Sequence, residues 1–102
     1  MGINVSKGTY RLAAAQPTAV FVGLSSGQLL PANQLRTSIM CINLSDGNIS
    51  LAFGWPAVLD QGVTLQPGDV FFMDDRSIMD GVINAIAEIN NSRLALQEWY
   101  IS

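Results

Sequence analysis

Short apolar runs separated by turn residues constrain the fold of this chain more than any other feature of its sequence. The runs include "TAVFVGL", "NISLAFG" and "DVFFMD", and the separators include "SSG", "PAN", "SDG" and "QPG". Runs of this length with a turn signal roughly every 8–12 residues are typical of an all-β sandwich or barrel. We therefore expect one all-β domain over residues 17–102. Residues 1–16 lack a strand pattern and are expected to form an N-terminal arm, ordered only where something holds it.

The stretch "IMCINLSDGNISLAFG", residues 39–54, predicts a β-hairpin. Asp-Gly favours a two-residue type I′ loop, and such a loop determines which residues face each other across the strands. With Asp46-Gly47 as the loop, large apolar side chains oppose one another on one side, which is expected to be the core face. These pairs are Leu44–Ile49, Ile42–Leu51 and Met40–Phe53. The opposite side is small and polar, with the pairs Ser45–Asn48, Asn43–Ser50 and Cys41–Ala52.

The last two apolar runs predict a second hairpin around Asn90-Asn91. Its expected cross-strand pairs are Glu88–Arg93, Ala87–Leu94, Ala85–Leu96 and Asn84–Gln97. A helix over residues 77–90 is an alternative, because their apolar residues also fit a helical stripe and Ser77 can serve as its N-cap. The strand is preferred, since Gly81 inside a helix costs about 1 kcal/mol.

The segment "LQPGDVFF" predicts a strand, a tight turn and another strand. Pro67 presets its own φ, and Gly68 can adopt the positive φ that the third position of a type II turn requires. The turn is therefore expected at these two residues.

Low charge is the main feature of the composition. Charged residues make up 13% of the chain, against roughly 25% in an ordinary soluble domain. This deficit suggests that much of the surface contacts other protein. The net charge is −3 and the few cations are scattered, so no basic patch for nucleic acid is predicted. Residues 12–24, "LAAAQPTAVFVGL", are too short and too interrupted to span a membrane or to act as a signal core.

The residues that usually carry chemistry are scarce. The chain has no histidine, which removes most acid–base, nucleophilic and metal-binding designs. Its single cysteine, Cys41, lies in an apolar run and is interpreted as a small buried hydrophobe, in a chain of intracellular origin. Asp74, Asp75 and Asp80 together suit a hard cation such as calcium, but their spacing matches no EF-hand, and a solvated turn is the favoured interpretation.

No pair of carboxylates is singled out for a glycosidase among Asp60, Asp69, Glu88 and Glu98. The sequence therefore predicts no catalytic residue, no cofactor and no metal site. The chain is expected not to be an enzyme.

Aromatic residues are the candidates for binding. Trp55 follows a strand end and precedes Pro56, which predicts a loop position at the rim of a sheet. Trp99 and Tyr100 are adjacent and point to opposite faces of the last strand, so at least one is expected to leave the core. Exposed aromatic side chains anchor protein interfaces and sugar-binding platforms. The alternative is that Trp55 caps the core and Trp99 fills it. With Tyr10 and Arg11 of the arm, these three residues form the predicted partner interface.

Three stretches carry a family resemblance: "LPANQLRTSIMCINLSDGNISLAFGWPA", "GVTLQPGDVFFMDD" and "GVINAIAEINNSRLALQEW". Together they cover roughly residues 29–99 and resemble small structural proteins of tailed bacteriophages, of the capsid decoration (cement) and head-fibre base type. The resemblance implies a jelly-roll-like β-sandwich that forms a homotrimer and is not an enzyme. It also implies fold-forming rather than catalytic roles for Asn33, Arg36, Asn43, Gly54, Pro67 and Gly68.

From this resemblance we expect a virion protein that is made in the host cytoplasm and located on the capsid surface. Its expected partner is the major capsid protein, which it binds and stabilises with the help of the arm, and neither nucleic acid nor membrane is expected as a partner. The alternative function is a carbohydrate-binding β-sandwich of a phage fibre. That alternative uses Trp55 and Tyr100 with the acidic loop.

Overall fold

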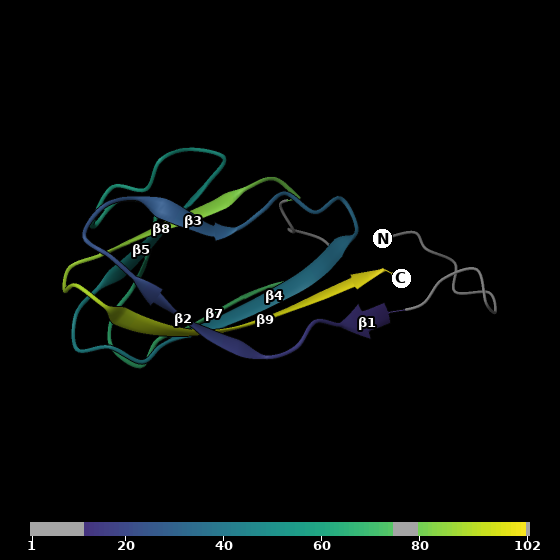
Figure 1. The fold of residues 1–102 in the computed structure, drawn as a ribbon, viewed down its shortest axis with the longest axis horizontal. Helices are drawn as coiled ribbons and strands as arrows, with labels where there is room; N and C mark the ends of the chain where they lie inside the picture. Colours follow the sequence, from purple (N-terminus) through teal and green to yellow (C-terminus); the bar gives the residue numbers. More distant parts are fainter. Residues whose placement is uncertain (1–11, 75–79, 102) are drawn as a thin grey trace.

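The protein is a sandwich of antiparallel β-sheets. The computed structural model describes residues 12–74 and 80–101, and these contain strands and no helix. The strands form a five-stranded sheet A and a four-stranded sheet B, which lie as two layers (Figure 1). The strands are β1 (Leu12–Ala14), β2 (Thr18–Val22), β3 (Gly27–Leu30), β4 (Arg36–Asn43), β5 (Ile49–Phe53), β6 (Val63–Leu65), β7 (Val70–Met73), β8 (Ile83–Ala87) and β9 (Ser92–Ile101).

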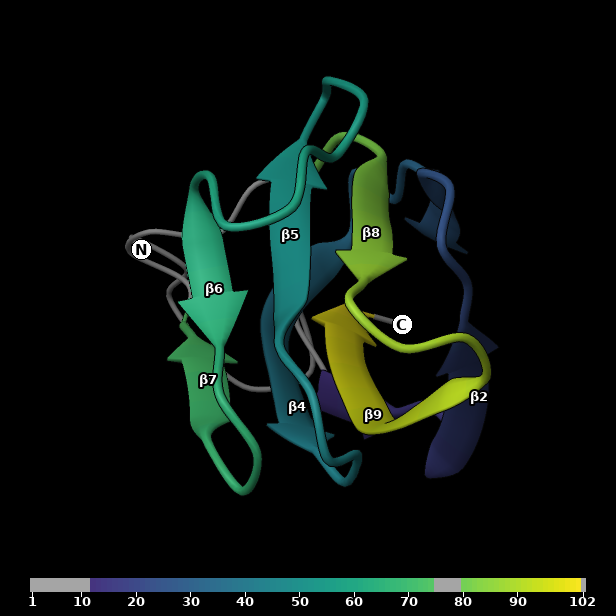
Figure 2. The same ribbon diagram turned by 90° about the vertical axis from the view of Figure 1, so that its left-hand side faces the viewer.

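The strand order is that of a jelly roll. Sheet A has the order β1-β9-β4-β7, with β2 also paired to β9, and sheet B has the order β3-β8-β5-β6. Figure 2 shows β6, β5 and β8 of sheet B side by side. From β2 onward the chain passes between the two sheets at every connection except β5 to β6, as in a pair of interlocked Greek keys. The predicted all-β, single-domain antiparallel β-sandwich is confirmed.

The end of the predicted arm belongs to sheet A. Residues 12–14, expected to lack strand structure, form β1 and pair with the C-terminal part of β9, while β2 pairs with its N-terminal part. This difference arises because β9 is ten residues long and offers an edge to both strands. Between them Ala15 stays attached, since its N–H donates to the Glu98 carbonyl at 2.8 Å and its carbonyl accepts the Gln97 amide at 3.1 Å. Tyr10 and Arg11 lie outside the described residues.

The hairpin predicted for residues 39–54 is wrong. Strand β4 lies in sheet A between β9 and β7, and β5 lies in sheet B between β8 and β6. The segment between them crosses from one sheet to the other, so none of the expected pairs forms. A type I′ loop needs positive φ at both central residues. Neither Asp46 nor Gly47 has one.

A buried asparagine holds this crossing in place. The side chain of Asn43 is fully buried at the end of β4. Its Nδ2 donates to the carbonyls of Gly47 and Leu65, both at 2.8 Å, and its Oδ1 accepts the N–H and the hydroxyl of Ser45. One amide therefore joins β4, the crossing segment and the end of β6. The expected fold-forming role of Asn43 agrees with this geometry.

The second predicted hairpin is also wrong, for the same reason. Residues 83–87 form β8, as the strand interpretation expected, and not a helix; residues 77–79 lie outside the described residues. However, β8 pairs with β3 and β5 in sheet B, whereas β9 belongs to sheet A. Asn91 takes φ 58° where the chain turns between the sheets. The pairs expected across Asn90-Asn91, Glu88–Arg93, Ala87–Leu94, Ala85–Leu96 and Asn84–Gln97, are absent from both sheets.

The turn at Pro67-Gly68 is confirmed. The Asp69 N–H donates to the Gln66 carbonyl at 2.9 Å, and Gly68 has φ 85°, as a type II turn requires. The flanking strands β6 and β7 belong to different sheets, so the turn forms an edge of the sandwich rather than a hairpin.

The core lies between the two sheets and consists of aliphatic side chains with one methionine and one cysteine. Sheet A contributes Val22, Ile39, Cys41, Met73, Leu94 and Leu96, and sheet B contributes Ile49, Leu51, Leu65, Ile83, Ala85 and Ala87. Buried residues alternate with less buried ones along β8, most of β4 and the first half of β9, because successive side chains of a strand point to opposite faces.

Candidate functional site

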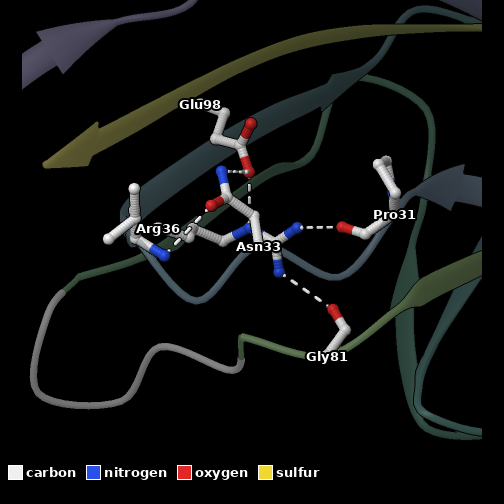
Figure 3. Close-up of polar contacts among 6 residues, drawn as sticks. Pro31, Asn33, Arg36, Gly81 and Glu98 are labelled. Atoms are coloured by element: carbon white, nitrogen blue, oxygen red, sulfur yellow. Dashed lines mark hydrogen bonds and ion pairs between the residues drawn. The ribbon is translucent and has the colours of Figure 1, made fainter. Parts of the chain in front are cut away.

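A buried arginine joins separate segments at one end of the sandwich (Figure 3). Arg36, the first residue of β4, is 3% exposed. Its Nε donates to Oε2 of Glu98 on β9 at 2.6 Å, and its terminal nitrogens donate to the carbonyls of Gly81 at 3.0 Å and Pro31 at 2.7 Å. A planar guanidinium with several donors suits such a junction. Arg36 thereby ties β9, the segment before β8 and the β3–β4 connection together.

Asn33 completes this network. Its Nδ2 donates to Glu98 Oε2 at 3.5 Å, and its Oδ1 accepts the N–H of Leu35 at 3.0 Å. Its own N–H donates to the Asp80 carbonyl at 2.7 Å. These contacts are made within the protein, which is the arrangement of a structural junction rather than of a site that binds a substrate.

Cys41 is packed inside the sandwich. It is fully buried, and this burial raises the pKa of its thiol from 9.0 to about 12. A nucleophilic cysteine needs a lowered pKa and some exposure. The interpretation as a small buried hydrophobe is therefore confirmed.

The acidic residues do not gather into a metal site within residues 12–74 and 80–101, where no group of three or more candidate ligands is close enough to hold a metal ion. Of the acidic loop considered for calcium, Asp74 and Asp80 are described, and Asp75 lies outside the described residues. Asp60 accepts the side-chain amide of Asn48 at 3.1 Å, and Asp69 accepts the Gln66 N–H inside its own turn.

The predicted aromatic residues do not form one site. Trp55 is 75% exposed just after β5, at the rim of sheet B as expected, and its carbonyl accepts the Asn84 amide at 2.7 Å. Trp99 pairs with Ser38 and Ala14 on the side of sheet A that points away from sheet B, while Tyr100 points to the other side opposite Arg36. Trp55 and Trp99 thus belong to different sheets, and both tryptophans lie outside the core cluster.

The outer face of sheet A, meaning its side chains that point away from sheet B, is mostly apolar, with Ser38, Arg93 and Gln97 as polar members. Its most exposed apolar members are Leu12, Phe21, Val70 and Phe72. Half-buried apolar side chains fill the space between them: Met40, Ile42, Ala95, Trp99 and Ile101.

This arrangement corrects the core face predicted for β4. Met40 and Ile42, expected in the core, point outward, where they pair with Phe72 and Val70 of β7. Cys41 and Asn43, expected on the small polar outer side, are fully buried. The predicted core face was reversed because it assumed that the larger side chains point inward. Asn43 can point inward because its amide is fully hydrogen-bonded.

The outer face of sheet B is more polar than that of sheet A, and another segment of the chain lies over part of it. Its outward side chains include Ser50, Thr64 and Asn84, which make hydrogen bonds. The segment 54–62 lies over this sheet, and its Asp60 N–H donates to the Ser50 hydroxyl at 2.8 Å, so that Ser50 is fully buried. The part of this face around Ser50 is therefore covered by the chain itself. On the outer face of sheet A, the Gln97 side chain donates to the Ala15 carbonyl at 3.1 Å.

The sequence contains a signal for the apolar outer face that the prediction missed. The runs "AVFV" and "VFFM" are apolar at every position instead of alternating. Continuous apolar strands are typical of sheets that are covered on both faces. Phe21, Val70 and Phe72 follow from this pattern, although none was predicted as an interface residue.

Comparison with known proteins adds no family to these observations. A scan against protein-family models and a search of curated proteins both find no match. Within the part of the chain that the structure describes, no helix has the length and hydropathy to cross a membrane.

Proposed function

We propose that this chain is a non-catalytic structural protein of a tailed-bacteriophage virion, which binds the capsid shell and stabilises it as a decoration protein. Its proposed partners are the major capsid protein and further copies of itself in a homotrimer. The protein would be made in the host cytoplasm and end on the capsid surface. The phage assignment comes from the sequence resemblance.

The observation that supports an assembly role best is the outer face of sheet A. Contiguous exposed apolar patches larger than a few hundred Å² are rare on monomeric proteins and mark interaction sites. On this face Phe21, Val70 and Phe72 are each more than half exposed. An exposed apolar face of this kind suits a protein that acts through contact area.

Sedimentation of the purified protein with empty capsid shells tests this function. We expect the protein to sediment with shells and to raise the temperature at which the shells fall apart. The matched variant is a deletion of residues 1–11, which removes Tyr10 and Arg11 but keeps β1 and its pairing with β9. We expect this variant to fold and to lose most of its shell binding. Full-length protein that stays in the supernatant at all shell concentrations would contradict the proposal.

A carbohydrate-binding module of a phage fibre is the second candidate, and the exposed ring of Trp55 favours it. An aromatic ring that is 75% exposed can stack on the apolar face of a sugar. Binding would produce a saturable change in tryptophan fluorescence, which Trp55→Ala abolishes and Trp99→Phe retains. No fluorescence change with a panel of host-surface sugars would remove this candidate.

A further inference from the structure

We infer that the outer face of sheet A is the surface through which copies of this chain contact one another. The inference shares self-association with the proposed function but does not depend on the capsid. It names the occupant of the apolar face, which is the same face of a second copy, turned toward a common symmetry axis.

The charge pattern of the face favours a second copy over strongly charged occupants. Among the outward positions of its described strands, Arg93 carries the only charge, and it lies in the same cross-strand row as Phe21, toward one end of the face. A strongly charged protein or an anionic lipid surface would need several complementary charges on this face. A second copy needs none. Apolar side chains of one copy then contact apolar side chains of the other, and Arg93 remains at the rim in contact with water.

The size of the face suits a specific interface between copies. Leu12, Phe21, Val70 and Phe72 are 59%, 70%, 56% and 56% exposed. Together they present on the order of 500 Å² of apolar surface, already near the upper end of what single patches on monomers reach. With the half-buried neighbours the face approaches the roughly 800 Å² per partner of a standard interface.

The face carries both hollows and protruding side chains. Two open hollows lie on it, with volumes of about 150 and 260 Å³. The first is lined by Met40, Ile42 and Ala95, and the second by Leu12, Phe72 and Trp99. The same face carries the protruding Phe21 and Val70. Where the face is turned toward the axis of a cyclic assembly, one part of it meets another part on the next copy, so protrusions of one copy can enter hollows of another.

A charge placed on this face tests the inference. In sedimentation velocity, we expect the unaltered protein to be an oligomer of its 11.0 kDa chain. Phe72→Glu should weaken association by roughly thirtyfold or more and shift the population toward monomer, because it puts a charge among desolvated aromatic side chains. Val58→Glu is the matched control, since Val58 is 50% exposed in the segment that covers sheet B. Far-UV circular dichroism reports whether each variant is folded.

Cross-linking provides a measurement that does not depend on a destabilising charge. Cys41 is buried, so Met40→Cys introduces one thiol at the centre of the face. A short bis-maleimide should join copies of Met40→Cys into dimers on a denaturing gel. The same reagent should leave Val58→Cys as single chains.

The outcomes separate this inference from the proposed function. The inference would be supported if Phe72→Glu forms monomers while Val58→Glu does not, and if Met40→Cys is cross-linked while Val58→Cys is not. An unaltered protein that is monomeric at every concentration, or a Phe72→Glu variant that associates as tightly as Val58→Glu, would overturn it. A monomer that still sediments with shells would overturn the inference while retaining the capsid function, and an oligomer indifferent to shells would do the reverse.

Discussion

Replacement of Arg36 by methionine should be among the most destabilising single changes in this protein. The side chain of Arg36 is completely buried, and its partner Glu98 is 14% exposed. Arg36→Met keeps the packing volume but removes the ion pair and the hydrogen bonds to the carbonyls of Pro31 and Gly81. It leaves a largely buried carboxylate without its cation.

The expected cost is large compared with the stability of a domain of this size. Removal of one partner from a buried ion pair typically costs about 3–5 kcal/mol. A domain of about 100 residues has a free energy of unfolding of roughly 5–15 kcal/mol, and each kcal/mol corresponds to about 4–8 °C in Tm. We therefore expect Arg36→Met to lower the Tm by at least about 12 °C.

Urea unfolding followed by circular dichroism measures this loss, at one protein concentration for all variants. The double variant Arg36→Met, Glu98→Met removes both charges and should be more stable than the sum of the single changes predicts, by about 1–3 kcal/mol. Arg93→Gln is the matched control, because Arg93 is an exposed arginine, and it should change the free energy of unfolding by less than about 0.5 kcal/mol. A cost below about 1 kcal/mol for Arg36→Met would refute the reasoning that this junction holds the end of the sandwich.

Three further predictions concern single residues. The pKa of the Cys41 thiol is raised from 9.0 to about 12 by burial, so the unfolded chain loses this proton first as the pH rises. The contribution of this thiol to the free energy of unfolding is thus complete below pH 9 and falls by about 1.4 kcal/mol per pH unit up to pH 12. In urea unfolding, the free energy of unfolding of Cys41→Ala should not show this fall with pH. Asn43→Ala removes the amide donor from the carbonyls of Gly47 and Leu65, although the Ser45 hydroxyl still reaches the Gly47 carbonyl, and should cost about 1–3 kcal/mol in the same assay. A loss under about 0.5 kcal/mol would contradict the role of this amide. Gly68→Ala forces a side chain into φ 85° and should cost about 1–2 kcal/mol, whereas Gly27→Ala, which meets no atom within 4 Å, is the control and should be close to neutral.

Local features of the sequence predicted the class of fold because their physical causes are local. The spacing of turn residues and apolar runs indicated an all-β sandwich, and the Pro67-Gly68 turn formed as its backbone preferences require. The apolar run around Cys41 predicted its burial, although the predicted hairpin register put Cys41 on the polar side. Gly81 argued against a helix, and residues 83–87 do form a strand.

The pairing of strands was decided by the tertiary structure. Asp46-Gly47 and Asn90-Asn91 have the chemistry of hairpin loops, but both lie where the chain crosses between sheets. Turn chemistry reports local backbone preference and does not say which strand becomes the neighbour. In this protein β9 pairs with β4, and β5 pairs with β8, which buries all four strands at interior positions of their sheets.

The direction of the side chains on β4 was also decided by tertiary structure. Alternation along the strand separates Met40 and Ile42 from Cys41 and Asn43, but it does not say which set points inward. Hydrogen bonds from Asn43 to Gly47 and Leu65 make burial of the smaller, more polar set favourable. The sequence by itself therefore determined an all-β chain with little surface charge and no histidine chemistry. Only the folded arrangement of the two sheets placed Phe21, Val70 and Phe72 together with Met40 and Ile42 on one outward face.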